Sequence, residues 1–247
     1  MCGRYAQTAD MRELMEQFEV TGTSPQSSLP LNWNIAPTNP IYIVRANDRS
    51  GNDIKSERAL ATVSWGLIGP WLTDLQEARA SQSRAINARS ESIHEKPTFR
   101  NAFRSTRCLI PASGYYEWAT ALGQYRPKQP FYISARDGMA LPIAGIWSSW
   151  TAPNGEVIET ASIITQEAQG ELETIHSRMP VFMPPDRWDL WLNPRNTDVN
   201  ELKSLMVVEH PESIVIARPV SDAVNSVANN GKELTVETPL GEPETLF

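Results

Sequence analysis

Cys2, the second residue of the chain, carries the strongest signal for chemistry. A small residue at this position lets methionine aminopeptidase remove Met1, so the mature chain is expected to begin with cysteine. Such a terminus places an α-amino group and a thiol on adjacent carbons. The α-amino group has a pKa of about 7.7–8.0, so a sizeable fraction is a neutral nucleophile at physiological pH. The amine can attack an aldehyde to form an imine, and the thiol can then close a five-membered thiazolidine ring. The dipeptide alone also fits a cysteine that is merely a small second residue.

Four further residues lie in segments suited to acid–base or positioning chemistry: Asn34, Asn87, Glu117 and His176. Glu117 interrupts the aromatic, apolar run GYYEWA, where burial would raise its pKa and let it move protons. If Glu117 instead lies on the solvent-exposed face of a half-buried strand, its pKa is not raised and it does not move protons. His176 in ETIHSRM is either a proton shuttle or a turn residue. Asn34 in NWNIAPT and Asn87 in INARSE either orient a substrate or close an Asx-turn.

Basic and aromatic residues supply candidates for nucleic-acid contact. Arginines able to hold phosphates are Arg4, Arg84, Arg89 and Arg178. The stretch from Arg84 to Arg107 contains six basic and two acidic residues, which fits a basic face that binds DNA. Arginines exposed to solvent on a helix would give the same count. Trp65 and Trp71 flank GLIGP and could stack on bases, while core packing is the more common fate of tryptophan.

The composition of the chain excludes several kinds of protein and several kinds of functional site. The chain has 247 residues and a net charge of −7, which argues against a generic nucleic-acid coat. Two cysteines exclude a disulfide framework, and three separated histidines give no metal-ligand spacing, so no metal or other cofactor is expected. No run of 18 apolar residues and no signal-peptide pattern is present, so we expect no membrane span and a cytoplasmic location.

Runs rich in β-branched and aromatic residues predict many strands and few helices. The expected strands cover 41–46, 61–68, 107–111, 114–119, 130–135, 139–150, 157–165 and 213–220. A helix is expected in TADMRELMEQF with Thr8 as its cap, two short ones between 88 and 107, and others in QGELETIH and PDRWDLWL. Residues 70–83 are expected to be irregular. The pattern predicts an α+β fold of mixed or antiparallel sheets, curled toward a barrel with flanking short helices, in a single domain.

Nine motifs occur along the chain in a fixed order: MCGRYAQ, NWNIAPT, VSWGLIGPW, AINARSES, RCLIPASGYYEW, IAGIWSSW, ASIITQEA, IHSRMPVFM and WDLWL. Together they resemble the SRAP family, named SOS response-associated peptidase, over about residues 2–230. The resemblance implies a sensor of abasic sites in single-stranded DNA that forms a covalent DNA–protein crosslink through its N-terminal cysteine. It also implies a mixed α+β fold with curled sheets around a basic groove.

Roles carried over by the resemblance fall on residues already singled out. Cys2 would be the nucleophile, Glu117 would move protons during imine formation and ring closure, and His176 would assist acid–base steps, including crosslink reversal or strand cleavage. Asn87 would position the terminal amine or the opened sugar. The residues implied to line the DNA-binding groove are Arg4, Asn34, Trp71, Arg89, Thr165 and Arg178.

Two other functions remain open from the sequence. An N-terminal cysteine with a carboxylate and an imidazole also resembles N-terminal nucleophile hydrolases, so the chain could be an autoproteolytic peptidase or amidohydrolase. A non-catalytic reader of modified bases is the third alternative. We further expect a monomer, with an SRAP-like domain over 2–230 and a flexible acidic tail over 231–247.

Overall fold

The computed structural model describes residues 2–47, 57–120, 125 and 128–240. The strands are β1 (Arg4–Gln7), β2 (Asn32–Ile35), β3 (Pro40–Ala46), β4 (Arg58–Trp65), β5 (Asn87–Arg89), β6 (Arg107–Ala112), β7 (Gly114–Trp118), β8 (Pro130–Ala135), β9 (Leu141–Thr151), β10 (Val157–Glu167), β11 (Arg178–Pro180) and β12 (Val215–Pro219). The α-helices are α1 (Met11–Gln17), α2 (Leu75–Arg84), α3 (Arg100–Ser105), α4 (Trp188–Leu192) and α5 (Val199–Leu205). Short 3-10 helices are η1 (Gly170–Thr174), η2 (Pro185–Arg187), η3 (Pro211–Ile214), η4 (Asp222–Asn225) and η5 (Lys232–Thr235).

Five strands form a closed barrel. Their order is β10, β4, β3, β6 and β9, and β9 pairs in turn with β10, which completes the ring. All neighbours in the ring are antiparallel except β4 and β10, which are parallel. β10 also holds two short strands outside the ring: β5 runs parallel to it and β11 antiparallel. The long strand β10 is therefore the element to which the barrel's additional strands attach.

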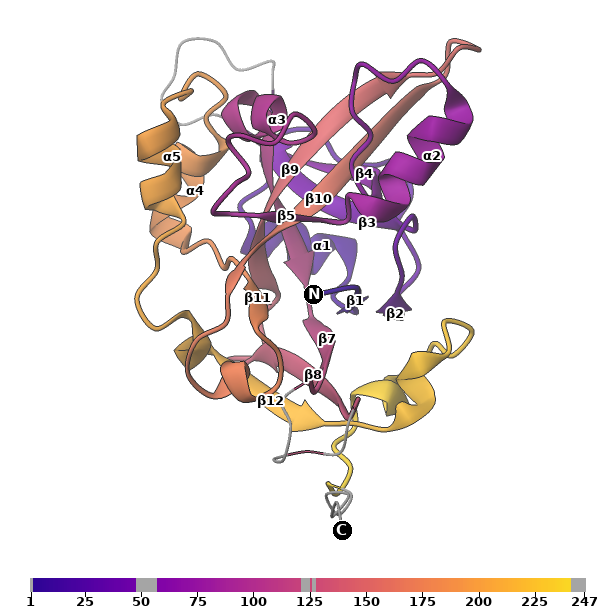
Figure 1. Ribbon diagram of the computed structural model, residues 1–247, viewed down its shortest axis with the longest axis vertical. Helices are drawn as coiled ribbons and strands as arrows, with labels where there is room; N and C mark the ends of the chain where they lie inside the picture. Colours follow the sequence, from indigo (N-terminus) through magenta and orange to yellow (C-terminus); the bar gives the residue numbers. More distant parts are fainter. Residues whose placement is uncertain (1, 48–56, 121–124, 126–127, 241–247) are drawn as a thin grey trace.

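A second sheet of five antiparallel strands, ordered β12, β8, β7, β1 and β2, extends from one end of the barrel. In Figure 1 the barrel fills the upper part of the view and β7, β8 and β12 lie below it, with β1 between them. Only Ser113 separates β6 of the barrel from β7 of the sheet. The Ser113 amide donates to the Ala6 carbonyl (2.8 Å), and its hydroxyl accepts from the Thr8 amide (2.8 Å). This corner fixes β1 against the junction of the two sheets.

Gly66 allows α2 to dock on the end of β4. Its φ of +110° lies in the region that favours glycine, and an added Cβ would come within 2.2 Å of the Gln82 carbonyl oxygen. The Gly66 amide donates to the Ala161 carbonyl of β10 (2.7 Å). A side chain at this position would separate α2 from the barrel.

The predicted fold class is confirmed: the chain is a single mixed α+β domain of curved sheets with a few short helices. Two large apolar clusters fill it. One joins the barrel to α1, α3, α4 and α5, and the other contains Cys2, Tyr5, Trp65 and Tyr115. Cys108 is buried, as its apolar strand predicts. The N-terminal segment with Cys2 is thus part of a core.

Several local predictions are wrong. α1 is capped by Asp10 rather than Thr8, because Asp10 and Glu13 form a reciprocal capping box. The segment 70–83, expected to be irregular, contains most of α2, whose N-cap is Asp74. Between 88 and 107 the structure has turns and only one α-helix, α3. QGELETIH forms a 3-10 helix.

Arg107 does not belong to a basic surface. It is 2% exposed, and its guanidinium donates to the carbonyls of Trp191 (2.6 Å), Phe103 (2.9 Å), Asn193 and Asn196 (3.0 Å). Arg107 therefore donates hydrogen bonds to carbonyl groups around α4. It does not add exposed positive charge to the basic stretch between Arg84 and Arg107 that the sequence shows.

Within the described residues, no helix is long and apolar enough to cross a bilayer. The predicted tail begins at 231, and its described part contains η5, where Leu234 is buried against Tyr116 and Val220. Residues 241–247 of that tail lie outside the described residues, as does Met1.

Candidate active site

Cys2 is buried just before β1, at the junction of the two sheets. Its thiol lies 3.9 Å from the Arg4 carbonyl oxygen. The side-chain amide of Asn87 donates to the Cys2 carbonyl (2.8 Å). Asn87 stands opposite Ile163 in the parallel pairing of β5 and β10, so the long barrel strand β10 holds it in place. The backbone of Cys2 is therefore tied to the barrel wall through one side chain.

Glu117 belongs to β7, which pairs directly with β1 in the register Arg4 to Tyr116 and Tyr5 to Tyr115. Glu117 is 3% exposed. Burial raises the pKa of its carboxyl to about 7, although the positive charge of the chain terminus acts in the opposite direction. The prediction that burial would perturb this carboxylate is confirmed, and the interpretation as a wet-face glutamate is wrong.

The thiol of Cys2 and the carboxyl of Glu117 act on each other. Burial raises the pKa of the Cys2 thiol, and the negative charge of Glu117 raises it further, while the terminal positive charge lowers it. The thiol is consequently protonated at neutral pH. Nucleophilic sulfur would form here only if the proton moved to a neighbouring base as the reaction proceeded.

His176 follows η1 and approaches the end of β7, where the Thr120 amide donates to the Ile175 carbonyl (2.8 Å). The His176 Nδ1 accepts from the Arg178 amide (3.0 Å), which leaves the proton of the neutral ring on Nε2. Burial lowers the pKa of His176, and the positive charge of the chain terminus lowers it further. Cys2, Asn87, Glu117 and His176 are thus brought together at one end of the barrel.

Arg178 and Arg89 lie on the two short strands attached to β10. In the ladders of β10, Glu167 stands opposite Arg178 and Thr165 opposite Arg89. The Arg178 guanidinium forms a bidentate ion pair with Glu91 (2.6 and 3.0 Å) and donates to the Thr165 carbonyl (2.7 Å). Burial acts to raise the pKa of Glu91, but the hydrogen bonds and charge of Arg178 lower it overall.

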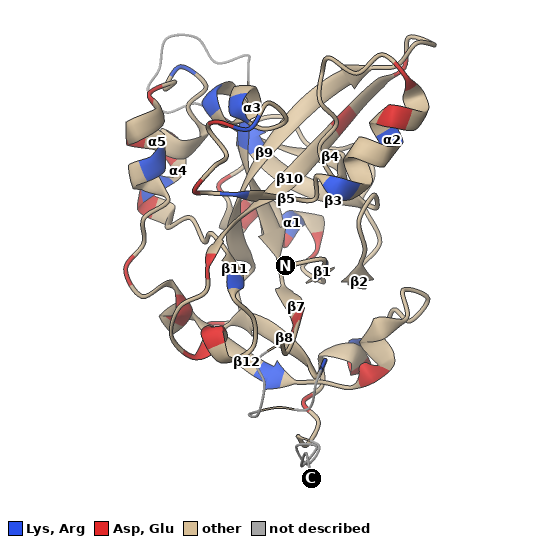
Figure 2. Ribbon diagram, in the orientation of Figure 1, with Lys and Arg blue, Asp and Glu red and all other residues tan. Residues whose placement is uncertain are grey.

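Arg89 on β5 is exposed, whereas the Thr165 side chain on β10 is fully buried. Arg100 and Arg104 add two basic positions on α3, which packs against β9 and β6 (blue in Figure 2). Arg89, Arg100 and Arg104 are thus exposed positive charges on a chain that is acidic overall.

Arg4 and Asn34 form a connected pair on β1 and β2. Arg4 donates to the Asn34 side-chain oxygen (2.7 Å) and to the Val224 carbonyl (3.0 Å). The Asn34 side-chain nitrogen donates to the carbonyls of Val224, Ser226 and Asn229 at 2.9–3.2 Å. Asn34 is 3% exposed, so its amide holds the segment after η4 rather than facing solvent.

Trp71 lies apart from the Cys2 group. It is 50% exposed in the loop between β4 and α2, and it borders a shallow pocket with Thr98, Asn101 and Ser149. Trp65, in contrast, is fully buried and packs edge-to-face on Tyr5.

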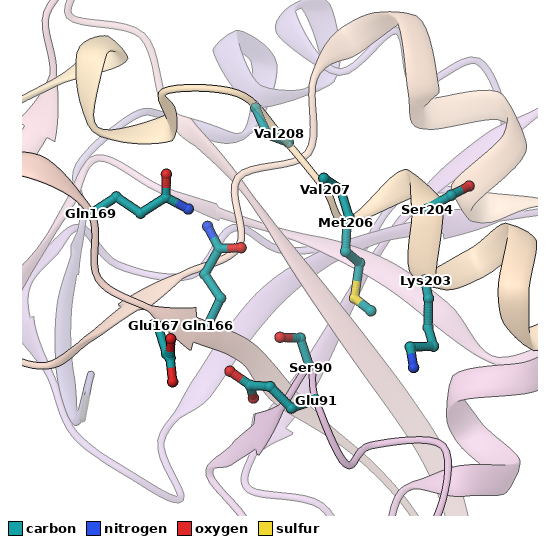
Figure 3. A pocket seen from close by; sticks show the side chains of 10 residues that line it. All are labelled: Ser90, Glu91, Gln166, Glu167, Gln169, Lys203, Ser204, Met206, Val207 and Val208. Carbon is teal, nitrogen blue, oxygen red and sulfur yellow. The ribbon is translucent and has the colours of Figure 1, made fainter.

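A second groove, missed by sequence reasoning, lies beside the Arg178–Glu91 ion pair. Figure 3 shows Lys203 and Met206 on one wall, facing Ser90, Glu91 and Gln166 on the other. Its lining residues are Ser90, Glu91, Gln166, Glu167, Gln169, Lys203, Ser204, Met206, Val207 and Val208. The groove shares Glu91 with the ion pair, and Cys2 does not line it. No sequence motif marks it, because α5 reaches β10 only through the tertiary fold.

Sequence reasoning also missed the aromatic residues around Cys2. Tyr5 and Tyr115 lie in the same buried cluster as Cys2, and they stand opposite each other on β1 and β7. The alternation in GYYEWA, which puts Tyr115 on the same face as Glu117, was the signal that could have placed Tyr115 in the site. Within the described residues, no group of three or more His, Cys, Asp or Glu side chains is arranged to hold a metal ion.

Comparison with known proteins identifies the family. The model of the family described as "SOS response associated peptidase (SRAP)" matches residues 1–227. Abasic site processing protein YoqW of Bacillus subtilis is 35% identical over 234 residues, covering 95% of this chain and 98% of that protein. Abasic site processing protein YMR114C of Saccharomyces cerevisiae is 26% identical over 277 residues, covering 100% of this chain and 70% of that protein.

Solved structures agree with the fold. A protein from Bacteroides thetaiotaomicron superposes with a TM-score of 0.81 at 24% identity, covering 96% of this chain and all of the other. A Bordetella bronchiseptica protein gives a TM-score of 0.71 at 25% identity, covering 89% of this chain and all of the other. The motif order, the site at the barrel's end and the match along nearly the whole sequence lead to one conclusion: the chain belongs to the SRAP family.

Proposed function

We propose that this protein processes abasic sites in DNA by capturing the opened sugar covalently at Cys2. Relatives that align with 95–100% of the chain are named abasic site processing proteins. The observation that carries the proposal is the burial of Glu117 beside Cys2, which raises the pKa of the carboxyl to about 7. A carboxyl with this pKa both gives and accepts protons at neutral pH, as imine formation requires.

The chemistry begins after removal of Met1. The Cys2 amine attacks the C1′ aldehyde of the ring-opened sugar, the N–C1′ bond forms, and the carbonyl oxygen takes a proton from Glu117. The attacking nitrogen returns one proton to the Glu117 carboxylate, a second proton transfer from that carboxyl expels the oxygen as water, and a protonated imine remains. The sulfur then adds to C1′, the C=N electron pair returns to nitrogen, and the thiol proton passes to the Glu117 carboxylate. The product is a neutral thiazolidine, which hydrolyses less readily than the charged iminium.

His176 serves a second branch of the same reaction. Because burial lowers its pKa, the ring is neutral at physiological pH, and its Nε2–H can donate a proton or a hydrogen bond. Removal of a proton from C2′ of the imine would expel the 3′ phosphate by β-elimination, which is an abasic-site lyase reaction. The same imidazole assists reversal of the crosslink when the sugar is released. Asn87 supports both branches by fixing the Cys2 carbonyl.

Single-stranded DNA is the expected substrate, because an opened sugar and unstacked bases are accessible there. Arg4, Arg89 and Arg178 supply the phosphate contacts, and Trp71 offers an exposed ring farther along the strand. Asn34 and Thr165 act through the backbone they hold, since both side chains are buried. With a net charge of −7, binding should weaken steeply as salt increases. The protein is proposed to act as a cytoplasmic monomer.

The test is a crosslinking assay with purified protein whose intact mass shows that Met1 is absent. Incubation with a single-stranded abasic oligonucleotide should give a heat-stable shifted band on a denaturing gel. Cys2→Ala should abolish the band, whereas Cys108→Ala, which removes a buried thiol elsewhere in the core, should retain it. An undiminished band with Cys2→Ala would contradict the proposal.

A peptidase function is the second candidate, because Cys2, Glu117 and His176 lie at one site and the family description contains the word peptidase. An N-terminal nucleophile hydrolase would use the same amine and thiol on an amide. Cleavage of peptide substrates without DNA, abolished by Cys2→Ala, would favour it. Removal of Met1 by aminopeptidase would expose the nucleophile without self-cleavage.

A further inference from the structure

The Tyr5 hydroxyl is a buried polar group that the proposed chemistry does not yet use. Tyr5 is 0% exposed, as is Cys2, and both belong to the same packed cluster. Among the residues that the structure describes, the hydroxyl has no hydrogen-bond partner. A buried hydroxyl that is left unpaired opposes folding, so its retention here calls for an explanation.

The ring of Tyr5 is held firmly. β1 pairs on both sides, placing Tyr5 opposite Ile35 of β2 and Tyr115 of β7. Its ring packs edge-to-face on Trp65, with 5.3 Å between ring centroids and an interplanar angle of 71°. These contacts fix the ring, so a hydrogen-bond partner has to come to the hydroxyl.

Tyr5 and Cys2 are positioned by one connected set of contacts. The Trp65 indole nitrogen donates to the Ile86 carbonyl (3.0 Å), which immediately precedes Asn87. Asn87 in turn donates to the Cys2 carbonyl (2.8 Å). The tyrosine ring and the thiol-bearing residue are therefore fixed relative to each other through the same edge of the barrel.

Ring closure creates a need that this hydroxyl can meet. As sulfur loses its proton it becomes negative in a buried site, where the Glu117 carboxyl already raises the pKa of the thiol. A buried anion requires a hydrogen-bond donor. Burial, and then the charge of Cys2, raise the pKa of Tyr5, so the phenol keeps its proton as a donor.

We propose that Tyr5 is a further catalytic residue, whose hydroxyl donates a hydrogen bond to the Cys2 sulfur as that sulfur attacks C1′. This inference rests on the proposed function. The S–C1′ bond forms, the C=N electron pair returns to nitrogen, and the thiol proton goes to the Glu117 carboxylate, while the tyrosine keeps its own proton. Tyr5 acts on ring closure and not on the preceding imine, because amine attack leaves the sulfur neutral.

The two steps can be separated experimentally with Tyr5→Phe, which removes only the oxygen. Borohydride reduces the imine and traps it, whereas the heat-stable crosslink formed without reductant reports ring closure. For Tyr5→Phe we expect the trapped imine to form at the wild-type rate within twofold. The heat-stable crosslink should form roughly ten- to hundredfold more slowly, as expected for the loss of one hydrogen bond to a charged group.

Tyr116→Phe is the matched control, because it also removes a buried tyrosine hydroxyl from this sheet. That hydroxyl donates to the Trp33 carbonyl (2.8 Å) and lies in a different cluster from Cys2. Tyr116→Phe should leave both rates unchanged. Urea unfolding of the two variants shows whether each is folded under the assay conditions.

Three outcomes would overturn the inference. Unchanged ring closure in Tyr5→Phe would do so, as would equal slowing of both steps in a folded variant. A selective loss of ring closure in Tyr115→Phe but not in Tyr5→Phe would assign the donor to the neighbouring strand instead. If wild-type protein forms no adduct either with or without borohydride, the proposed function itself is contradicted. That result is distinct from the three above, which concern the role of Tyr5 alone.

Discussion

Replacing Glu117 with glutamine is expected to stabilise the protein at neutral and alkaline pH while abolishing covalent capture. Burial raises the pKa of this carboxyl from its ordinary value of 4.5 to about 7 in the folded state. The folded protein therefore binds the proton more tightly than the unfolded chain does. The free energy of unfolding must decrease as pH rises from about 4.5 to about 7, and it stays low above that.

The magnitude follows from the difference between the two pKa values. Each pKa unit corresponds to about 1.4 kcal/mol, so a difference of about 2.5 gives about 3 kcal/mol above pH 7. The side chain is only 3% exposed, so solvent screening reduces this little. Glutamine is neutral at every pH and avoids this loss. Its own packing changes stability by an amount that does not vary with pH.

Urea unfolding of wild type and Glu117→Gln at pH 5, 6.5 and 8 measures the effect. The stability of the variant relative to wild type should increase by about 2–3 kcal/mol between pH 5 and pH 8. In parallel, the abasic-oligonucleotide assay should show loss of the heat-stable band. A stability difference that stays constant across this pH range would refute the assignment of Glu117 as a carboxyl protonated by burial.

Two further substitutions test the surroundings of the site. Glu91→Gln removes the partner of the Arg178 guanidinium, so DNA should bind about two- to fivefold more tightly at low salt, measured by fluorescence anisotropy in a Cys2→Ala background. Weaker binding would show that the ion pair orients Arg178 productively. Asn34→Ala removes hydrogen bonds to Arg4 and to three carbonyls, and should lower the free energy of unfolding by about 2–3 kcal/mol. A loss under about 0.5 kcal/mol in urea titrations would contradict this structural role.

The long strands could be predicted from the sequence because their own composition determines them. Segments 41–46, 130–135 and 157–165 are rich in β-branched and aromatic residues, and they appear as β3, β8 and β10. The segment 70–83 was mispredicted because it lacks an apolar period: only Ala78 and Gln82 of α2 are buried. Its helix depends instead on the Asp74 cap and on docking against Gly66.

The residues of the candidate site could be named from the sequence more easily than their positions in the fold could be predicted. Glu117 could be singled out because it interrupts an apolar strand. Its exposure, however, depended on which face of the sheet that contains β7 packs against the core. Arg4, Asn34, Asn87 and Arg178 lie on strands of three or four residues: β1, β2, β5 and β11. None of these strands has enough residues to show a period, and each exists because a longer neighbour supplies its hydrogen bonds.

This division has a consequence for how the site works. The long strand β10 pairs with β4, β9, β5 and β11, so Arg89 and Arg178, which are proposed to contact DNA, are carried on short strands attached to the barrel. β7 brings Glu117 and Tyr115 from the second sheet, and β1 brings Tyr5 and the segment that begins with Cys2. The proposed nucleophile and its proposed proton acceptor thus belong to the outer sheet, whereas Asn87 and Arg178 lie on short strands attached to the barrel. Ser113 alone links β6 to β7 along the chain, while the core shared by Tyr5, Tyr115 and Trp65 and the Asn87–Cys2 hydrogen bond join the two sheets in space, so the alignment of thiol and carboxyl depends on this corner and this core together.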